Sequence, residues 1–411
     1  MIDKKNSCKT TTLENGLQVA VIRKDGALFS CNIGIRTGAL HEGPAQKGIC
    51  HFLEHMIFKG TIFRSNKTLN EDLEYLGGEY NAFTDYVSTV FTITALQEEI
   101  SEGLGILNEM VRFPAFPVDE MEKEKGVVLS ELKATLDDTE SLTLNLLNRK
   151  AYRKSGLRTD ILGTKTCIKG FTRKKLADFH SKHYVPGNAV LTIVSPLEFS
   201  LVLKIVKDIF GSWTGDAPKK NEISFEKNRP GRFKSSKQME QSAIGMLYTF
   251  ELEEHEKLPL RILNYKLGNS ANSMLFRKLR EEMGLAYDAY SDLDLTDRIQ
   301  SLTIYTQVHD DSTEVALDII KGITEGLAQG SVISDRDLEV MKKVMKTGVM
   351  STLEDTHHLC SSIMDDLIEG DPPMKFLEDI EDLEKITLVD VERVAAKVLK
   401  DPTIFILRAG D

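Results

Sequence analysis

Three residues in one short segment have the types and the spacing of a metal-dependent hydrolytic site: His51, Glu54 and His55. They lie in 49-ICHFLEHMIFKGT-61, where they form the pattern His-x-x-Glu-His. On a helix over 49–57, residues three and four apart share a face, so the three side chains project together. The two imidazoles can then hold one metal ion, while Glu54 acts on a water molecule beside it. The alternative is that two histidines merely pack near a glutamate.

A catalytic zinc site needs a further protein ligand, and a second predicted helix supplies two candidates. Zinc binds imidazole nitrogen and carboxylate oxygen in a tetrahedral shell that keeps one position for water. The helix expected over 121–136 carries Glu124 and Glu131, and Glu131 follows His55 by 76 residues. The two glutamates are two helical turns apart and therefore share a face. One of them can coordinate the metal while the other orients a ligand, which makes coincidence hard to defend.

The elements that must position these residues occur in the same order in both halves of the chain. Alternation of apolar residues predicts strands, and a period near 3.6 residues predicts helices. In the first half we expect strands over 17–23 and 29–38, a strand pair over 76–96, and helices over 49–57, 98–112 and 118–136. In the second half we expect a strand over 242–250, a helix over 258–280, a strand pair over 284–308, and helices over 312–328 and 334–353.

This order predicts an internal repeat of about half the chain, although many α/β halves look alike at this level of detail. The segments 134-ATLDDT-139 and 351-STLEDT-356 support the repeat, because each ends a long helix with an acidic start. We place an N-terminal domain at 1–215, a linker rich in Pro, Gly, Lys and Asn at 216–238, and a C-terminal domain at 239–411.

Composition narrows the class of protein. The 411 residues are too many for one ordinary core and fit two to four domains. A formal net charge of −11 argues against a nucleic-acid partner and leaves peptides, basic ones among them, as partners. The five cysteines form no CxxC pair, which is typical of a reducing compartment. The sequence begins without an apolar leader and has no apolar run of about 18 residues, so we expect a cytoplasmic, bacterial protein that does not enter a membrane.

At these motifs the sequence resembles the pitrilysin–insulinase family of zinc peptidases, the inverzincins. Within that family it is similar to the zinc-bearing subunit of mitochondrial processing peptidase and its bacterial relatives. The resemblance covers nearly the whole chain and rests on HFLEHMIFKGT, Glu131, 77-GGEYNAFTDYVSTVF-91 and 275-LFRKLREEMGLAYDAYS-291. It implies an α+β fold of two repeated α/β sandwich halves, each an antiparallel sheet covered by helices. Together they form one half of a clamshell, so we expect a homodimer.

The resemblance also implies a role for each residue of the metal set. His51, His55 and Glu131 match the zinc ligands of the family. Glu54 matches the general base, and Glu124 matches a carboxylate that orients a ligand without touching the metal. The implied cofactor is therefore Zn²⁺.

A second group of residues matches positions that contact the substrate. Asn81 and Ala82 match the edge-strand positions that receive the substrate backbone, and Phe83 is expected to line a side-chain pocket. Arg280 and Tyr287 lie in the C-terminal domain and match an arginine–tyrosine pair that reaches the substrate from the opposite unit. We predict a catalytic role for this pair.

The resemblance predicts a zinc metalloendopeptidase that hydrolyses peptides or short unfolded segments inside a closed dimeric chamber. Two alternatives stay open: a non-catalytic core subunit of the same fold, and a catalytic subunit that needs a distinct partner chain. The presence of the ligands, the base and the arginine–tyrosine pair in one chain favours the enzyme and the homodimer. Val87 stands where the family often has an acidic residue, which leaves open altered specificity or weaker catalysis.

Overall fold

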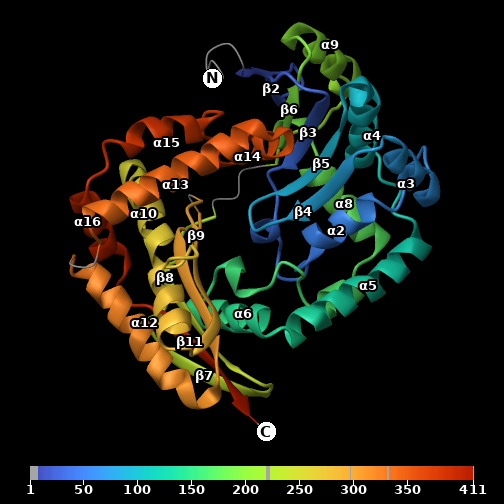
Figure 1. Ribbon diagram of the computed structural model, residues 1–411. Helices are drawn as coiled ribbons and strands as arrows, with labels where there is room; N and C mark the ends of the chain where they lie inside the picture. The colour runs from blue at the N-terminus through green and yellow to red at the C-terminus, as the bar shows by residue number, and fades with distance from the viewer. Residues whose placement is uncertain (1–7, 219–222, 297, 331–332, 411) are drawn as a thin grey trace. The chain divides into compact units, whose positions relative to one another are not determined.

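The computed structural model describes residues 8–218, 223–296, 298–330 and 333–410, and the chain divides into two compact units. The first unit comprises Met1–Leu132, Asp160–Glu222 and Met350–Lys375, and the second comprises Lys133–Thr159, Ile223–Val349 and Phe376–Asp411. Each unit contains one sheet with helices packed on it (Figure 1). The predicted α+β fold of two sheet-plus-helix halves is therefore confirmed.

The first sheet has six strands in the order β1-β2-β6-β3-β5-β4. Its strands are β1 (Cys8–Thr12), β2 (Gln18–Arg23), β3 (Leu28–Ile35), β4 (Glu79–Thr84), β5 (Thr89–Leu96) and β6 (Ala189–Ser195). Neighbours are antiparallel except β2 and β6, which run parallel. Strand β4 is an edge strand that pairs, among the described strands, with β5 alone. This edge lies beside α2 (Ile49–Ile57), the helix of the His-x-x-Glu-His motif (Figure 1).

The second sheet repeats the topology of the first, in the order β7-β11-β8-β10-β9. Its strands are β7 (Gly231–Gln238), β8 (Ser242–Thr249), β9 (Ala286–Asp294), β10 (Ser301–Val308) and β11 (Thr403–Gly410). The parallel pair β7/β11 takes the place of β2/β6, and the remaining pairs are antiparallel as in the first sheet. The shared strand order and pairing confirm the predicted internal repeat.

Helices account for most of the remaining regular structure, and those predicted around the motifs are present. In chain order the other helices are α3 (Asn66–Tyr75), α4 (Ile100–Arg112), α5 (Val118–Asp137), α6 (Thr139–Ala151), α7 (Lys165–Lys169), α8 (Arg173–His183), α9 (Phe199–Phe210), α10 (Glu254–Leu267), α11 (Met274–Phe276), α12 (Thr313–Ala328), α13 (Asp335–Glu354), α14 (Thr356–Glu369), α15 (Lys375–Leu383) and α16 (Leu388–Val398). Short turns of other helix types are η1 (Ala39–His41), η2 (Gln97–Glu99), η3 (Gly156–Arg158), η4 (Pro186–Asn188), η5 (Arg277–Glu282, a π-helix) and η6 (Asp310–Ser312). Over the described part of the chain, no helix is long and apolar enough to cross a membrane.

Two of the expected elements differ in the structure. The single helix predicted over 258–280 is interrupted after α10, because 268-GNSANS-273 consists of residues that favour turns. The predicted linker 216–238 ends in a strand, since β7 occupies Gly231–Gln238. Its sequence GRFKSSKQ is polar and lacks the apolar alternation from which strands are predicted. It nevertheless forms an exposed edge strand, which is held by backbone pairing with β11. Residues 219–222 of that linker, and residues 1–7 at the N-terminus, lie outside the described part of the chain.

Each compact unit contains one helix from the other half of the sequence: α14 belongs to the first unit and α6 to the second. Helix α14 packs across β3 and β6 of the first sheet, and α6 packs across β8 and β11 of the second. A Cβ atom on Gly34 would lie 2.6 Å from Sδ of Met364, and one on Gly245 would lie 3.1 Å from a methyl carbon of Leu147. Glycine thus lets each helix approach its sheet closely. The unit to which α6 or α14 belongs is decided by its packing on strands far away in the sequence. It cannot be inferred from the position of the helix along the chain.

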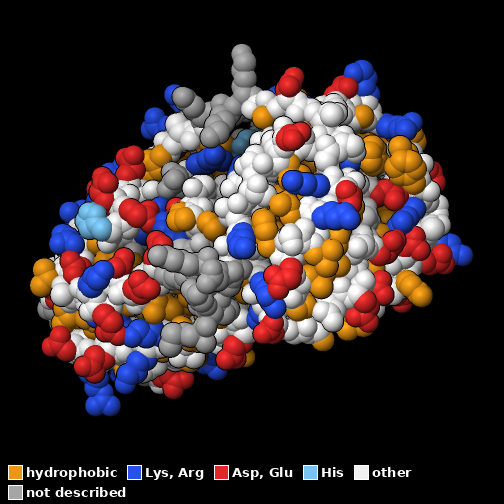
Figure 2. Space-filling view, turned by 90° about the horizontal axis from the view of Figure 1, so that it is seen from above, with side chains coloured by type: hydrophobic (Ala, Val, Ile, Leu, Met, Phe, Trp, Pro, Cys, Tyr) orange, Lys and Arg blue, Asp and Glu red, His pale blue; other side chains and the backbone are white. Residues whose placement is uncertain are grey.

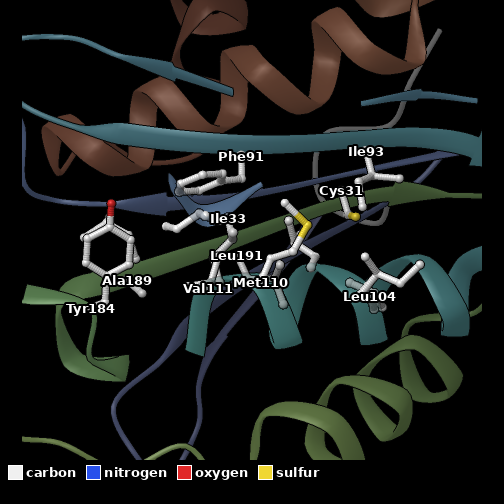
Figure 3. Close-up of a cluster of buried hydrophobic side chains, with 14 of the residues drawn as sticks. Cys31, Ile33, Phe91, Ile93, Leu104, Met110, Val111, Tyr184, Ala189 and Leu191 are labelled. Atoms are coloured by element: carbon white, nitrogen blue, oxygen red, sulfur yellow. The ribbon is translucent and has the colours of Figure 1, made fainter. Parts of the chain in front are cut away.

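The core that supports the motif lies on the other face of the first sheet. Figure 3 shows apolar side chains of β3, β5 and β6 directed toward α4. The residues that meet there are Cys31, Ile33, Phe91, Ile93, Leu191, Leu104, Met110 and Val111. Helix α2 adds its own apolar side chains to this core, so the motif helix is anchored in the hydrophobic core of its unit.

Candidate metal centre

Helix α2 presents two different faces. Ile49, Phe52, Leu53 and Met56 are fully buried in the core of the first unit. The remaining face carries the three residues of the motif, because the spacing of three and four residues returns to the same side of a helix. Only the first of them, His51, is itself nearly buried, at 8% exposure. The apolar face therefore fixes the helix, and the polar face is left for chemistry.

The structure brings His51, His55 and Glu131 together at one point. Their nearest ligand atoms all lie within 4.8 Å of one another. The two Nε2 atoms are 3.2 Å apart. One carboxylate oxygen of Glu131 lies 3.7 Å from Nε2 of His51, and the other lies 3.7 Å from Nε2 of His55. The two histidines come from α2 and the glutamate from α5, so the cluster needs both helices.

This donor set fits a zinc ion. Two imidazole nitrogens and one carboxylate are ligands that zinc accepts in catalytic sites, where a further position is left for water. Burial and the neighbouring His55 lower the pKa of His51 to about 4, so its ring is neutral near pH 7 and free to bind a metal. The two Nε2 atoms face each other at 3.2 Å, so a cation bound there could accept the lone pairs of both rings.

Glu124 lies beside the cluster and does not join it. Its Oε1 is 2.7 Å from Nδ1 of His55, and its Oε2 is 2.9 Å from Nζ of Lys59. Burial raises the pKa of Glu124, but the hydrogen bonds from His55 and Lys59 outweigh it and hold the pKa below its ordinary value. An ionised carboxylate on Nδ1 orients the ring so that Nε2 faces Glu131. This position matches the predicted role of a carboxylate that orients a ligand.

Glu54 occupies the place expected for a general base. Its side chain is half-buried one residue before His55, and its Oε2 accepts a hydrogen bond of 2.6 Å from the Thr84 hydroxyl. Burial raises the pKa of Glu54, against the smaller lowering effects of Thr84 and His55. A carboxylate whose pKa is shifted toward neutrality can both accept and return a proton. Thr84 ends β4, so the edge strand and the motif helix meet at this side chain.

A pocket of about 300 Å³ lies between α2 and β4. Among its lining residues are Glu54, His55 and Glu124 from the candidate centre and Asn81 and Ala82 from the edge strand. The predicted neighbourhood of base, ligand and edge strand is therefore present in the structure.

The third predicted substrate-contacting residue, Phe83, does not line this pocket. Phe83 is 42% exposed and is not among the residues that line it, because side chains alternate along a strand and its neighbours Ala82 and Thr84 face α2. The aromatic wall comes instead from Phe58 and Tyr80, whose ring centroids are 6.3 Å apart. Tyr80 lies two residues before Ala82, so on a strand the two side chains share a face; this spacing was the sequence signal that Tyr80 lines the same pocket.

Arg280 and Tyr287 lie together in the second unit. The Arg280 guanidinium is 4.8 Å from the centroid of the Tyr287 ring and 4.7 Å from that of Phe276. Arg280 belongs to the π-helical turn η5 and Tyr287 to the edge strand β9, and the tyrosine ring is 79% exposed. The family resemblance pointed to these two residues as a pair. The contribution of Phe276, which flanks the same guanidinium, was not predicted.

The second unit carries no counterpart of the metal cluster among the residues that the structure describes. Helices α5 and α13 are both 20 residues long and start 217 positions apart, so their positions correspond one to one. Met341 then stands in the place of Glu124, and Gly348 in the place of Glu131. Met341 is buried to the same degree as Glu124, so an apolar contact replaces the ionic one.

Comparison with known proteins gives one consistent result. A family model described as insulinase (peptidase family M16) matches residues 18–165, and one described as peptidase M16 inactive domain matches residues 170–345. The uncharacterized zinc protease YmxG of Bacillus subtilis (strain 168) is 31% identical, covering 94% of this chain and 93% of that protein. The mitochondrial-processing peptidase subunit beta of Bos taurus is 33% identical over 49% of this chain and 41% of that protein. A crystal structure of a Helicobacter pylori protease shares the fold, with a TM-score of 0.91 at 22% identity over 98% of this chain and 99% of that one.

Proposed function

Since the chain belongs to the insulinase family, peptidase family M16, we propose that it is a zinc-dependent endopeptidase that cleaves peptides or short unfolded segments. Relatives named as zinc proteases support protease chemistry and zinc. One observation carries the proposal to this chain: His51, His55 and Glu131 converge within 4.8 Å beside Glu54. No second cluster of possible metal ligands occurs among the described residues of the second unit, which agrees with its match to a domain described as inactive, so we assign the chemistry to the first unit.

The residues of the first unit divide the reaction among them. His51, His55 and Glu131 would hold the zinc, which supplies Lewis-acid polarisation and lowers the pKa of a water molecule to about 7. Glu54 accepts a proton from water as its oxygen attacks the peptide carbonyl carbon. Glu54 then gives that proton to the amine when the carbon–nitrogen bond breaks. Glu124 keeps the His55 ring in the orientation that this requires.

The edge strand β4 is the surface we assign to the substrate backbone. Its outer N–H and C=O groups can pair with an extended peptide, which gives affinity through the main chain with little demand on sequence. Asn81 and Ala82 lie at the pocket beside Glu54, so a peptide added to this edge passes close to the base. A substrate side chain can enter the pocket between α2 and β4, where Phe58 and Tyr80 form part of the wall.

We further propose that the chain works as a homodimer in a closed chamber, with Arg280 and Tyr287 of one copy reaching the substrate held by the first unit of the other. Tyr287 is exposed, Arg280 is half-buried, and the two are held together by stacking, which leaves the tyrosine accessible to a substrate. Their hydrogen-bond donors would stabilise the carbonyl oxygen as its negative charge grows.

Basic peptides are the substrate class that net charge favours, because the chain carries −11 at pH 7. Figure 2 shows a face on which acidic and basic side chains are interspersed, without the single-sign basic patch that a nucleic-acid partner needs. The five cysteines are free in the structure, in keeping with a reducing compartment. The bacterial cytoplasm stays a prediction from the sequence.

The first experiment compares the zinc-loaded protein with its Glu54→Gln variant on an internally quenched basic peptide. We expect cleavage by the wild type, a loss of about 10²-fold or more in kcat for the variant, and equal zinc content. Cleavage that is equal in both proteins contradicts the role of Glu54. If neither cleaves while both hold zinc, the chain is a scaffold of this fold or needs a distinct partner chain.

A complementation experiment tests the homodimer. Glu54→Gln and Arg280→Ala are each expected to be inactive alone. When the two are mixed and allowed to exchange subunits, a site shared between copies regains Glu54 from one chain and Arg280 from the other. Recovered activity supports the shared site. A protein that is monomeric by light scattering, or a mixture that stays inactive although exchange is shown, overturns it.

A further inference from the structure

A buried carboxylate outside the motif holds the start of the motif helix. Glu42 is 6% exposed, and its Oε2 accepts a hydrogen bond of 2.9 Å from the backbone N–H of Gly48. Its Oε1 accepts a second bond of 2.9 Å from the backbone N–H of Cys50. These N–H groups belong to the N-cap and the second residue of α2. Glu42 therefore does for this helix what a capping side chain ordinarily does.

The helix has no cap of its own. Gly48 is its N-cap residue, adopts a φ of 91°, and offers no side chain for the first-turn N–H groups. Those groups have no partner within a helix, and a buried donor without a partner costs about 1–3 kcal/mol. A glycine is required at this position by the backbone: a Cβ atom there would lie 2.4 Å from the carbonyl oxygen of Leu162. The cap must therefore come from elsewhere in the chain, and Glu42 supplies it.

The cap acts directly on a metal ligand because the helix is short. Helix α2 has nine residues, and His51 is its third, directly after Cys50. A displacement of the first turn moves His51 relative to His55 one turn later, and hence changes the 3.2 Å separation of their Nε2 atoms. The loop at Gly163 packs closely against the residues that precede α2: a Cβ on Gly163 would lie 2.1 Å from the carbonyl oxygen of Lys47. Such steric contact only keeps the first turn from moving toward the loop. The two hydrogen bonds of Glu42 hold the turn in place.

We propose that Glu42 is a positioning residue for the metal centre, which fixes the first turn of α2 and thereby the place of His51 relative to His55 and Glu131. This inference rests on the proposed zinc function. It assigns Glu42 a role in zinc affinity and in catalysis, beyond a contribution to stability.

The test is a zinc titration of Glu42→Gln against a matched control. Glutamine keeps the size and one acceptor oxygen but turns an amide donor toward one of the two backbone donors. Glu256→Gln is the control, because Glu256 is 7% exposed and accepts a bond from the Glu253 backbone N–H at the start of α10 in the second unit. For each protein, the zinc dissociation constant is measured by competition with a chromophoric chelator, the unfolding midpoint on the metal-free form, and kcat and KM on the quenched peptide.

We expect Glu42→Gln to raise the zinc dissociation constant by about 10-fold to 100-fold, in the range that supporting partners of metal ligands show. Its kcat should fall at saturating zinc while KM stays close to that of the wild type. Glu256→Gln should lower the unfolding midpoint and leave zinc affinity and kcat unchanged. Glu42→Ala, if it folds, should weaken zinc binding further than Glu42→Gln.

A zinc dissociation constant for Glu42→Gln equal to that of the wild type, with a lowered unfolding midpoint, reduces Glu42 to a structural cap and overturns the inference. The outcome is separable from the proposed function. If the wild type binds zinc tightly but cleaves no peptide, the endopeptidase assignment fails, and the zinc titration still decides the role of Glu42.

Discussion

Glu124 and His55 are joined by a contact of 2.7 Å between a carboxylate oxygen and Nδ1 of the imidazole ring. This contact decides which nitrogen of His55 is directed at Glu131, because a ring held at Nδ1 must present Nε2 on its other side. The orientation of a candidate metal ligand is thus set by a residue outside the cluster of His51, His55 and Glu131. Lys59 extends the arrangement by binding the second oxygen of Glu124 at 2.9 Å.

Replacing Glu124 should weaken zinc binding without removing a ligand. In Glu124→Gln the charge that holds Nδ1 and Lys59 is lost while the volume is kept. We expect the zinc dissociation constant to rise by about 10-fold to 100-fold, measured by chelator competition. Glu122→Gln is the control, since Glu122 lies on the same helix and pairs at the surface with Lys125. Equal zinc affinities in the two variants would contradict the role given to Glu124.

Removing the hydroxyl of Thr84 should shift the pH dependence of activity. Burial raises the pKa of Glu54, and the hydrogen bond from Thr84 lowers it. Glu54 must be ionised to accept a proton, so loss of that bond in Thr84→Val raises its pKa and moves the acid limb of kcat/KM to higher pH. Thr84→Ser keeps the donor and should keep the wild-type profile. A valine variant whose acid limb is unmoved, or moves to lower pH, would show that Glu54 is not the group that titrates.

Phe276 should matter for activity through Arg280. Its ring centroid lies 4.7 Å from the guanidinium, which is also 4.8 Å from the ring centroid of Tyr287. A cation–π contact at an exposed site contributes about 0.5–1 kcal/mol, so Phe276→Leu should lower kcat/KM by about two-fold to five-fold. Phe276→Tyr should restore it. Phe113→Leu, which removes a similar contact with Arg112 in the first unit, should leave kcat/KM unchanged.

Acid should destabilise the first unit through His180. Burial lowers the pKa of His180 from 6.5 to about 4, against the smaller opposing effect of its hydrogen bond to the Val111 carbonyl. Below pH 6.5 the unfolded chain takes up a proton that the native ring does not, so stability falls as the pH falls. This group alone removes about 2 kcal/mol between pH 7 and pH 5.

The measurement is urea unfolding of the metal-free protein at pH 7 and pH 5. His180→Gln can keep a donor to Val111 and should lose less stability over this interval than the wild type, by about 2 kcal/mol. The control is His358→Gln, which changes a histidine with a 72% exposed side chain and should follow the wild type. An unchanged pH slope in His180→Gln would show that this ring is not the group responsible.

Local patterns predicted the parts of the site that lie within one element. The bounds of α2 agree with the helix expected over 49–57, because its apolar positions recur at helical spacing. The separation of Glu124 and Glu131 predicted a shared helical face, and both residues do reach His55. The strands β4 and β5 also fall within the predicted pair. In each case the arrangement within one helix or one strand pair follows from local geometry, whereas the contact between α2 and α5 does not.

Contacts between distant segments were not available from these patterns. Phe83 was predicted to line a side-chain pocket; the pocket beside Glu54 is lined by Phe58, Asn70 and Tyr80 without it, because the lining depends on which face of β4 packs against α2. Glu42 carries no local sign of capping a helix that begins seven residues later. The strand over Gly231–Gln238 was read as linker, since its polar side chains hide a backbone pairing with the far C-terminus.

The sequence by itself predicted the His51, Glu54 and His55 cluster, the shared face of Glu124 and Glu131, and the repeated order of elements, because each is expressed in residue types at regular spacing within an element. Only the tertiary structure decided that α6 and α14 cover the sheet of the other repeat, that Glu131 lies against both histidines, and that Glu42 and Lys59 contact the first turn of α2 and Glu124. The physical reason is the same for both. Helical and strand periodicity record which face of an element is buried, whereas the partner that buries it is chosen by shape and hydrogen bonding between segments far apart in the chain.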